Sequence, residues 1–155
     1  MRSGVLVNQY DQGDSEEVRC VDEKKIYRII DANFNRAKEG LRVCEDVCRF
    51  ILDAKELTRA FKDVRHRLTE VMSPWGLPRL IECRDIEMDV GKKDTGAEFR
   101  RTKVRDIFDA NIQRVKESIR VLEEFAKLKN KKAAQDLKKL RYRIYALEGK
   151  VIAGC

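Results

Sequence analysis

The sequence "IDANFNRAKEGLRVCED", residues 30–46, returns in the same chain as "FDANIQRVKESIRVLEE", residues 108–124. When the first position is left out, nine of the sixteen aligned residues are identical. A repeat kept only for packing would preserve its apolar stripe and let its charges drift, yet here the apolar positions vary more than the polar ones. The repeat therefore points to specific pairing or chemistry in each copy. The polar residues that return include Asp31/Asp109, Asn33/Asn111, Arg36/Arg114, Glu39/Glu117, Arg42/Arg120 and Glu45/Glu123.

Around this repeat, apolar residues recur at three- and four-residue steps, the spacing of one face of an α-helix. The repeat extends into a second helix of each half, because "FKDVRHRL" (61–68) aligns with "LKKLRYRI" (137–144). Two amphipathic hairpins bury their apolar faces by packing against each other. We therefore predict an all-α fold, an antiparallel four-helix bundle made of two repeated helical hairpins. Its helices are expected at about residues 22–52, 54–72, 102–128 and 131–152.

The chain length of 155 residues suits a single domain. Residues 1–21 lack helical periodicity and are expected to form a loosely ordered N-terminal segment. The remaining residues, 22–155, are expected to form one helical domain. The linker between the two hairpins, residues 73–101, is much longer than the two to eight residues that usually connect helices in a bundle, so it is expected to have a function or to be disordered. A short hairpin through "LIECRDIEMDV" would order part of it. The domain then divides into a hairpin (22–72), a linker (73–101) and a second hairpin (102–152).

Composition excludes several classes of protein. Charged residues make up 39% of the chain and hydrophobic residues 43%, which is typical of a helical globular protein. No apolar run reaches the roughly 18 residues of a membrane span, and the N-terminal apolar stretch is too short for a signal peptide. We expect a cytoplasmic protein with no membrane contact. The five cysteines have no secreted-scaffold spacing, so they are expected to be reduced, with Cys44 and Cys48 in the core.

The net charge of +7 favours an anionic partner: a nucleic acid, a nucleotide or a phosphorylated metabolite. Nucleic acid is disfavoured because the lysines of residues 129–139 are not interleaved with aromatic residues. The sequence contains neither a Walker A loop nor a GxGxxG loop nor a Ser-His-Asp set. Its single histidine, His66, is a weak candidate for a general base, and the catalytic residues stay unknown.

Four repeated polar residues fall on the apolar side of their helices and form the candidate substrate-binding set: Asn33, Arg36, Asn111 and Arg114. Polar groups at such positions must be hydrogen-bonded or must reach a wet cavity, because burying them unpaired costs several kcal/mol. Two alternatives remain open: a structural clamp between the hairpins, or a polar pocket open at one end. The alternating Arg and Glu residues, among them Arg42 and Glu45, are instead expected to face solvent.

The linker offers a second set of candidates. Carboxylates can hold Mg²⁺ with phosphate oxygens completing its shell, and Arg and Lys side chains can neutralise phosphates. Asp85 and Asp89 are the candidate metal ligands, while Arg84, Lys92 and Arg101 are the candidate phosphate-binding residues. The alternative is that this segment is only a solvated loop.

Five motifs in this order carry a family resemblance: "DANFNRAKEGLRVCEDVCRF", "VRHRL", "CRDIEMDVG", "DANIQRVKESIRVLEE" and "LRYRIYALE". Over about residues 26–148 the chain resembles the all-helical hydroxymethylpyrimidine phosphate kinase family, found free-standing or fused N-terminal to thiamin-phosphate synthase (thiamin-phosphate pyrophosphorylase). The resemblance implies a role in thiamin biosynthesis, with ATP as co-substrate and Mg²⁺ as cofactor. A chain of this length has no room for the (β/α)₈ barrel of the synthase.

These observations combine into one hypothesis and one alternative. The hypothesis is a phosphotransferase that makes hydroxymethylpyrimidine diphosphate from the monophosphate, with Mg²⁺ on Asp85 and Asp89. The alternative is a non-catalytic helical module that binds an anionic ligand or docks on thiamin-phosphate synthase, its repeated polar residues being structural. The sequence leaves open whether the chain forms a homo-oligomer.

Overall fold

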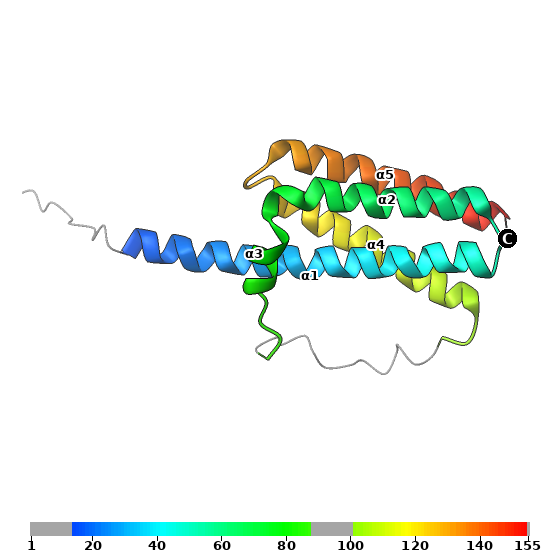
Figure 1. Ribbon diagram of the computed structural model, residues 1–155, viewed down its shortest axis with the longest axis horizontal. Coiled ribbons are helices and arrows are strands. Elements are labelled where there is room, and N and C mark those ends of the chain that lie inside the picture. The colour runs from blue at the N-terminus through cyan, green and yellow to red at the C-terminus, as the bar shows by residue number, and fades with distance from the viewer. Residues whose placement is uncertain (1–13, 88–100, 155) are drawn as a thin grey trace, which may run out of the picture.

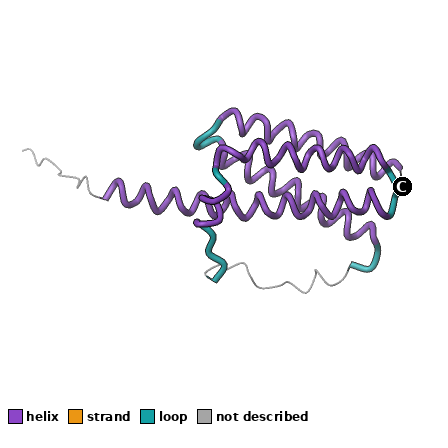
Figure 2. Tube along the Cα trace, in the orientation of Figure 1, coloured by secondary structure: helices purple, strands orange, loops and turns teal. Residues whose placement is uncertain are grey.

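The computed structural model describes residues 14–87 and 101–154, with side chains from residue 23 onward within these ranges. In this part of the chain there are helices and no strand (Figure 2), so the predicted all-α class is confirmed. The elements are α1 (Asp14–Phe50), α2 (Lys55–Met72), the short 3₁₀ helix η1 (Ser73–Trp75), α3 (Leu77–Glu82), α4 (Val104–Ala126) and α5 (Lys131–Gly154).

Four long helices lie side by side as a bundle (Figure 1). α1 packs against α2 and α4, and α5 completes the ring by packing against α4 and α2. Neighbouring helices run in opposite directions, as the colour gradient along each shows (Figure 1). The core holds the apolar stripes of all four helices, and both Cys44 and Cys48 are fully buried in it as expected. Burial raises the pKa of the Cys44 thiol, which keeps it protonated.

The helix that carries the first copy of the repeat begins earlier than expected. α1 starts at Asp14, eight residues before the predicted start at Asp22, so part of the segment expected to be loosely ordered is helical. This first part of α1 extends beyond the bundle (Figure 1). In the described part of the chain, no helix is both long enough and apolar enough to cross a membrane.

The expected linker begins with regular structure. Proline is tolerated in the first turn of a helix, and Pro74 and Pro78 occupy such positions in η1 and α3. Gly76, with φ of +70°, makes the turn between them. Leu80 is only 1% exposed and anchors α3 against the core. A hairpin through "LIECRDIEMDV" was therefore the wrong prediction for residues 80–82, which are helical, and its last three residues lie outside the described part.

α1 and α4 approach each other closely at Gly40. A Cβ atom there would lie 2.7 Å from Val115 Cγ2 and 3.0 Å from the Asn111 carbonyl oxygen. Real Cβ contacts are rarely this short, so the two helices can meet at this distance only because residue 40 has no side chain. This contact brings the two copies of the repeat together along the α1–α4 interface.

Candidate functional site

The alternating Arg and Glu residues of the repeat include a buried glutamate that forms ion pairs within the first hairpin. Glu45 on α1 is only 3% exposed. Its Oε2 accepts a hydrogen bond from Arg65 Nε on α2 at 3.0 Å, and its Oε1 accepts one from Arg42 Nη1 at 3.3 Å. The carboxylate therefore ties the two helices of the hairpin together.

The second hairpin contains the same arrangement at the equivalent residues. Glu123 on α4 is 4% exposed, and it accepts hydrogen bonds from Arg141 Nε at 2.9 Å and from Arg120 Nη1 at 3.0 Å. The prediction that these glutamates face solvent was wrong, because Arg65 and Arg141 on the facing helices supply the partners that allow burial. Arg65 and Arg141 are themselves repeated in "FKDVRHRL" and "LKKLRYRI", which was the signal for this clamp.

The two repeated asparagines are buried, as their positions on the apolar stripes indicate. Asn33 and Asn111 are each 8% exposed. The Nδ2 atom of Asn33 donates to the Ile29 carbonyl at 2.9 Å, and that of Asn111 donates to the Ile107 carbonyl at 2.8 Å. Each amide nitrogen is thus satisfied one turn back in its own helix, so these two bonds do not connect the hairpins.

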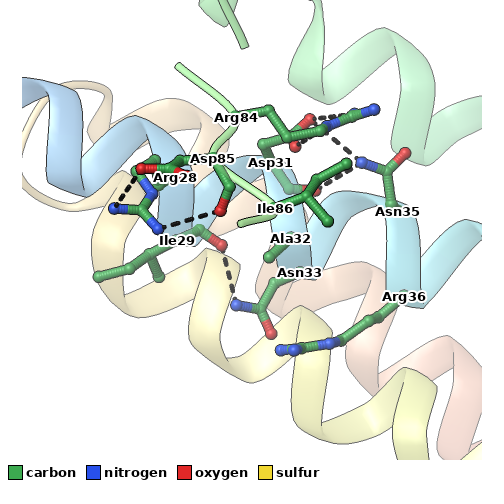
Figure 3. Close-up of a pocket in the computed structure, with 10 residues that line it drawn as sticks. All are labelled: Arg28, Ile29, Asp31, Ala32, Asn33, Asn35, Arg36, Arg84, Asp85 and Ile86. Carbon is green, nitrogen blue, oxygen red and sulfur yellow. Dashed lines mark hydrogen bonds and ion pairs between the residues drawn. The ribbon is translucent and has the colours of Figure 1, made fainter. Parts of the chain in front are cut away.

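The two repeated arginines do not form a buried pair. Arg36 is exposed, which contradicts the predicted inward position, and Arg114 is half-buried. A long side chain on the edge of an apolar stripe can reach solvent while its stem packs on the helix. Figure 3 shows the Arg36 side chain lying beside Asn33.

A cavity of about 390 Å³ joins the first half of α1 to the segment that follows α3. It contains Asn33 and Arg36 from the predicted substrate-binding set, together with Arg84 and Asp85 from the linker. Asn111 and Arg114 are not among its lining residues. The cavity is lined by Arg28, Ile29, Asp31, Ala32, Asn33, Asn35, Arg36, Arg84, Asp85 and Ile86 (Figure 3).

Asp31 holds Arg84 in place at this cavity. Arg84 Nε donates to Asp31 Oδ2 at 2.7 Å and Nη2 donates to Oδ1 at 2.8 Å, a two-point contact that fixes the guanidinium plane. Asp31 is 4% exposed, and Asn35 Nδ2 donates to its Oδ1 at 3.1 Å. The hydrogen bond from this carboxylate raises the pKa of Arg84 further above its usual range. Asp31 and Asn35 are not among the site residues predicted from the sequence, although Asp31 is one of the repeated residues.

The second copy of the repeat lacks this arrangement. Asp109, the equivalent of Asp31, is exposed and accepts hydrogen bonds from Arg105 Nε at 2.8 and 2.9 Å within its own helix. The two aspartates therefore occupy the same position of the repeat but bind different partners. Only Asp31 lines the cavity.

The candidate metal and phosphate residues are only partly brought together. Arg28 Nη2 donates to the Asp85 backbone carbonyl at 3.3 Å, and Arg28 Nη1 lies 3.9 Å from Asp85 Oδ2. In residues 14–87 and 101–154, no three His, Cys, Asp or Glu side chains gather so as to hold a metal ion. Arg101 is not among the residues that line the cavity. Asp89 and Lys92 lie outside the described residues.

Electrostatics favour an anionic ligand in this cavity. Three arginines line it against two aspartates, and no glutamate or lysine is among the lining residues. The Arg84 side chain is 38% exposed although two of its donors are used by Asp31, and a guanidinium has five N–H donors. Donors therefore remain that can bind phosphate oxygens, and the guanidinium is already oriented.

Comparisons with known proteins match the region that contains the cavity. Residues 28–150 match the model of the ThiD2 family. The chain is 47% identical over 124 residues to a thiamine-phosphate synthase from Synechocystis, which covers 79% of this chain and 35% of that protein. It is 38% identical over 148 residues to one from Nostoc punctiforme, covering 95% of this chain and 39% of that protein.

The chain thus spans little more than a third of the length of these relatives. No solved structure matches it. The family match takes in most of both helical hairpins and every residue that lines the cavity. The chain belongs to the ThiD2 family.

Proposed function

We propose that this protein acts in thiamin biosynthesis and transfers the γ-phosphoryl group of ATP to hydroxymethylpyrimidine phosphate. The observation that carries the proposal is the cavity lined by Arg28, Arg36 and Arg84. The relatives named thiamine-phosphate synthase support the pathway. The resemblance to hydroxymethylpyrimidine phosphate kinases supports the reaction, because the synthase consumes the diphosphate that such a kinase makes.

The chemistry requires little beyond positioning and charge neutralisation. An oxygen of the acceptor monophosphate attacks the γ-phosphorus of ATP, the bond from that phosphorus to the bridging oxygen breaks, and ADP leaves. The acceptor oxygen is already ionised, so no strong base is needed to deprotonate it. This suits a cavity whose lining contains no histidine. Fixed guanidiniums that face the transferred group stabilise the negative charge spread over its oxygens.

The contacts of each cavity residue suggest its role in binding the substrates. Arg84, fixed by Asp31, is the main phosphate-binding residue, because its orientation costs no further ordering when a ligand binds. Arg36 is the second, since it is exposed and lines the same cavity. Asn33 lies beside Arg36 and lines the cavity with its amide (Figure 3). Arg28 orients Asp85 through the two contacts described above.

Mg²⁺ is part of the proposal as the ion that accompanies ATP. In nucleotide sites Mg²⁺ is usually bound by one or two carboxylates together with phosphate oxygens. Asp85 supplies one such carboxylate at the edge of the cavity, and Asp89 is the candidate for a second. The ion would add positive charge between the two phosphate groups that react.

A coupled assay tests the proposal directly. The purified protein is incubated with ATP, Mg²⁺ and hydroxymethylpyrimidine phosphate, and ADP release is followed. We expect ADP release that depends on the pyrimidine and yields its diphosphate. ADP release no higher than in a reaction without the protein would refute the kinase activity.

The second candidate function is the non-catalytic binding module. One observation favours it: much of the repeated polarity is structural, since Glu45 and Glu123 form clamps and the amide nitrogens of Asn33 and Asn111 bond within their own helices. Calorimetric titration with the pyrimidine monophosphate separates the two. Saturable binding without any ADP release in the coupled assay identifies the module.

A further inference from the structure

A second cavity lies next to the arginine cavity and has a different character. Its volume is about 420 Å³, and it is bounded by α1, α2 and α3. Phe34, Met72 and Leu80 form an apolar floor, each of them at most 5% exposed. It is lined by Phe34, Asn35, Lys38, Glu39, Thr69, Met72, Ser73, Leu77 and Leu80.

The two cavities meet at Asn35, which lines both. Along α1, the arginine cavity uses residues 28, 29, 31, 32, 33, 35 and 36, whereas the apolar cavity uses residues 34, 35, 38 and 39. The middles of these two sets of residues are four to five residues apart, roughly 7 Å along the helix. One methylene ester between a ring and its phosphate has a length of the same order. A single small molecule can therefore place its phosphate in one cavity and its ring in the other.

We propose that the apolar cavity binds the flat nitrogen heterocycle of a substrate whose phosphate lies in the arginine cavity. This inference rests on the proposed function and adds to it the subsite for the ring. The pyrimidine of the acceptor and the adenine of ATP share this chemistry, so both are candidates for the same subsite.

The lining suits an aromatic ring. Phe34 offers a ring for offset or edge contact, and Met72 offers a thioether, which packs well against aromatic groups. Leu77 is 56% exposed at the rim, so a ligand would remove its apolar surface from water. Lys38 Nζ lies 5.3 Å from the centre of the Phe34 ring. The rim thus carries a cation for an anionic substituent. At Asn35 and Thr69 it carries oxygens that can accept a hydrogen bond from an amino group on the ring, because the Asn35 amide donates to Asp31 and the Thr69 hydroxyl donates to the Arg65 carbonyl.

Two exposed residues on α3 make a matched pair of variants. Leu77 and Ile81 are 56% and 50% exposed, but only Leu77 lines the cavity. Leu77→Gln keeps the side-chain length and removes the apolar contact at the rim, whereas Ile81→Gln makes a similar change outside the cavity. We expect Leu77→Gln to raise the KM of one substrate about tenfold, the effect of losing one good apolar contact. Ile81→Gln should leave both KM values within about twofold, and both variants should keep the melting temperature.

Trp75 provides a readout that does not depend on catalysis. It is the only tryptophan in the chain, is 4% exposed and lies between Ser73 and Leu77, both of which line the cavity. Titration with hydroxymethylpyrimidine phosphate, and separately with ATP, should change its fluorescence saturably for the ligand whose ring occupies the cavity. A response to the pyrimidine assigns the subsite to the acceptor, and a response to ATP assigns it to the nucleotide.

The outcomes separate this inference from the proposed function. An active enzyme whose Trp75 fluorescence is unchanged by both ligands, and whose KM values are unchanged in Leu77→Gln, overturns the ring subsite and leaves the kinase intact. A saturable fluorescence change that Leu77→Gln weakens, with no ADP release in the coupled assay, upholds the subsite and refutes the kinase.

Discussion

The two hairpins share one polar contact and differ in another. In both, a buried glutamate on the first helix binds an arginine on the second: Glu45 with Arg65, and Glu123 with Arg141. Each pair has the same Oε2–Nε geometry, at 3.0 and 2.9 Å. Because this contact is the same in both hairpins, we infer that its role is structural: it holds the two helices of each hairpin together.

The aspartates show the opposite behaviour. Asp31 reaches out of its own helix to orient Arg84 at the cavity, while Asp109 is occupied by Arg105 within α4. The repeat position is the same, but only the first copy takes part in a candidate site. The two halves therefore differ in polarity that is open to a ligand and share polarity that is structural.

The largest expected effect is on the shared clamp. Arg65→Met and Arg141→Met each remove the partner that a buried carboxylate has on the facing helix and leave it only the half-exposed arginine of its own helix, so each should lower the free energy of unfolding by about 3 kcal/mol. Arg67→Met is the control, because Arg67 and its partner Glu70 are both exposed and its second contact, with Asp136, is long at 3.7 Å, so these pairs should contribute less than about 1 kcal/mol. Urea unfolding measures all three. A loss below about 1 kcal/mol in either clamp variant would show that the pair is not a clamp.

Next in size is the effect of Arg84 on activity. Arg84→Gln removes an oriented guanidinium and should lower kcat/KM about 100-fold, or about 2.8 kcal/mol of transition-state stabilisation. Arg105→Gln breaks the equivalent pair in the second half and should change kcat/KM less than about threefold.

Arg84→Gln also removes the cationic partner of the buried Asp31 and can therefore lower stability as well as activity. A second variant is needed to separate the two effects. Arg36→Gln removes an exposed arginine from the same cavity and should reduce kcat/KM without lowering the melting temperature. Equal activity losses in Arg84→Gln and Arg105→Gln would mean that the cavity has no special role.

A smaller effect is expected where the halves meet. Gly40→Ala places a methyl group 2.7 Å from Val115 Cγ2, and the overlap should outweigh the gain in helix propensity, lowering stability by about 1–2 kcal/mol. Gly149→Ala has no atom within 4 Å and should raise stability by about 0.5–1 kcal/mol. Thermal unfolding of the two variants should therefore shift in opposite directions. A stabilised Gly40→Ala protein would show that the α1–α4 contact is loose.

The sequence contained enough to predict the bundle, because the helical spacing of apolar residues depends only on local geometry. It also showed that Asn33 and Asn111 are buried. The burial of Glu45 could not be read from its own helix, since it depends on Arg65 on a second helix twenty residues away. Pairing across helices is a tertiary property, and the repeat of both partners was its only trace in the sequence.

The site was harder to predict for the same reason. Arg84 and Asp85 were identified by composition alone, whereas their partners Asp31 and Arg28 lie more than fifty residues earlier and meet them only because α3 turns back onto α1. The helical wheel placed Arg36 inward because it treats a long side chain as a point on the helix. The exposed guanidinium shows that the reach of the side chain decides its position.

The smallest effect gives the finest test of the comparison. Asn33 and Asn111 make the same bond to their own helices, but only Asn33 lines the cavity. Asn33→Ala and Asn111→Ala should lower stability by similar amounts, about 1 kcal/mol each, because each loses one equivalent hydrogen bond. Only Asn33→Ala should also raise the KM of a phosphorylated substrate, by about fivefold, a difference of about 1 kcal/mol. If both variants raise KM equally, the second copy of the repeat also contacts substrate and the site extends across the α1–α4 interface.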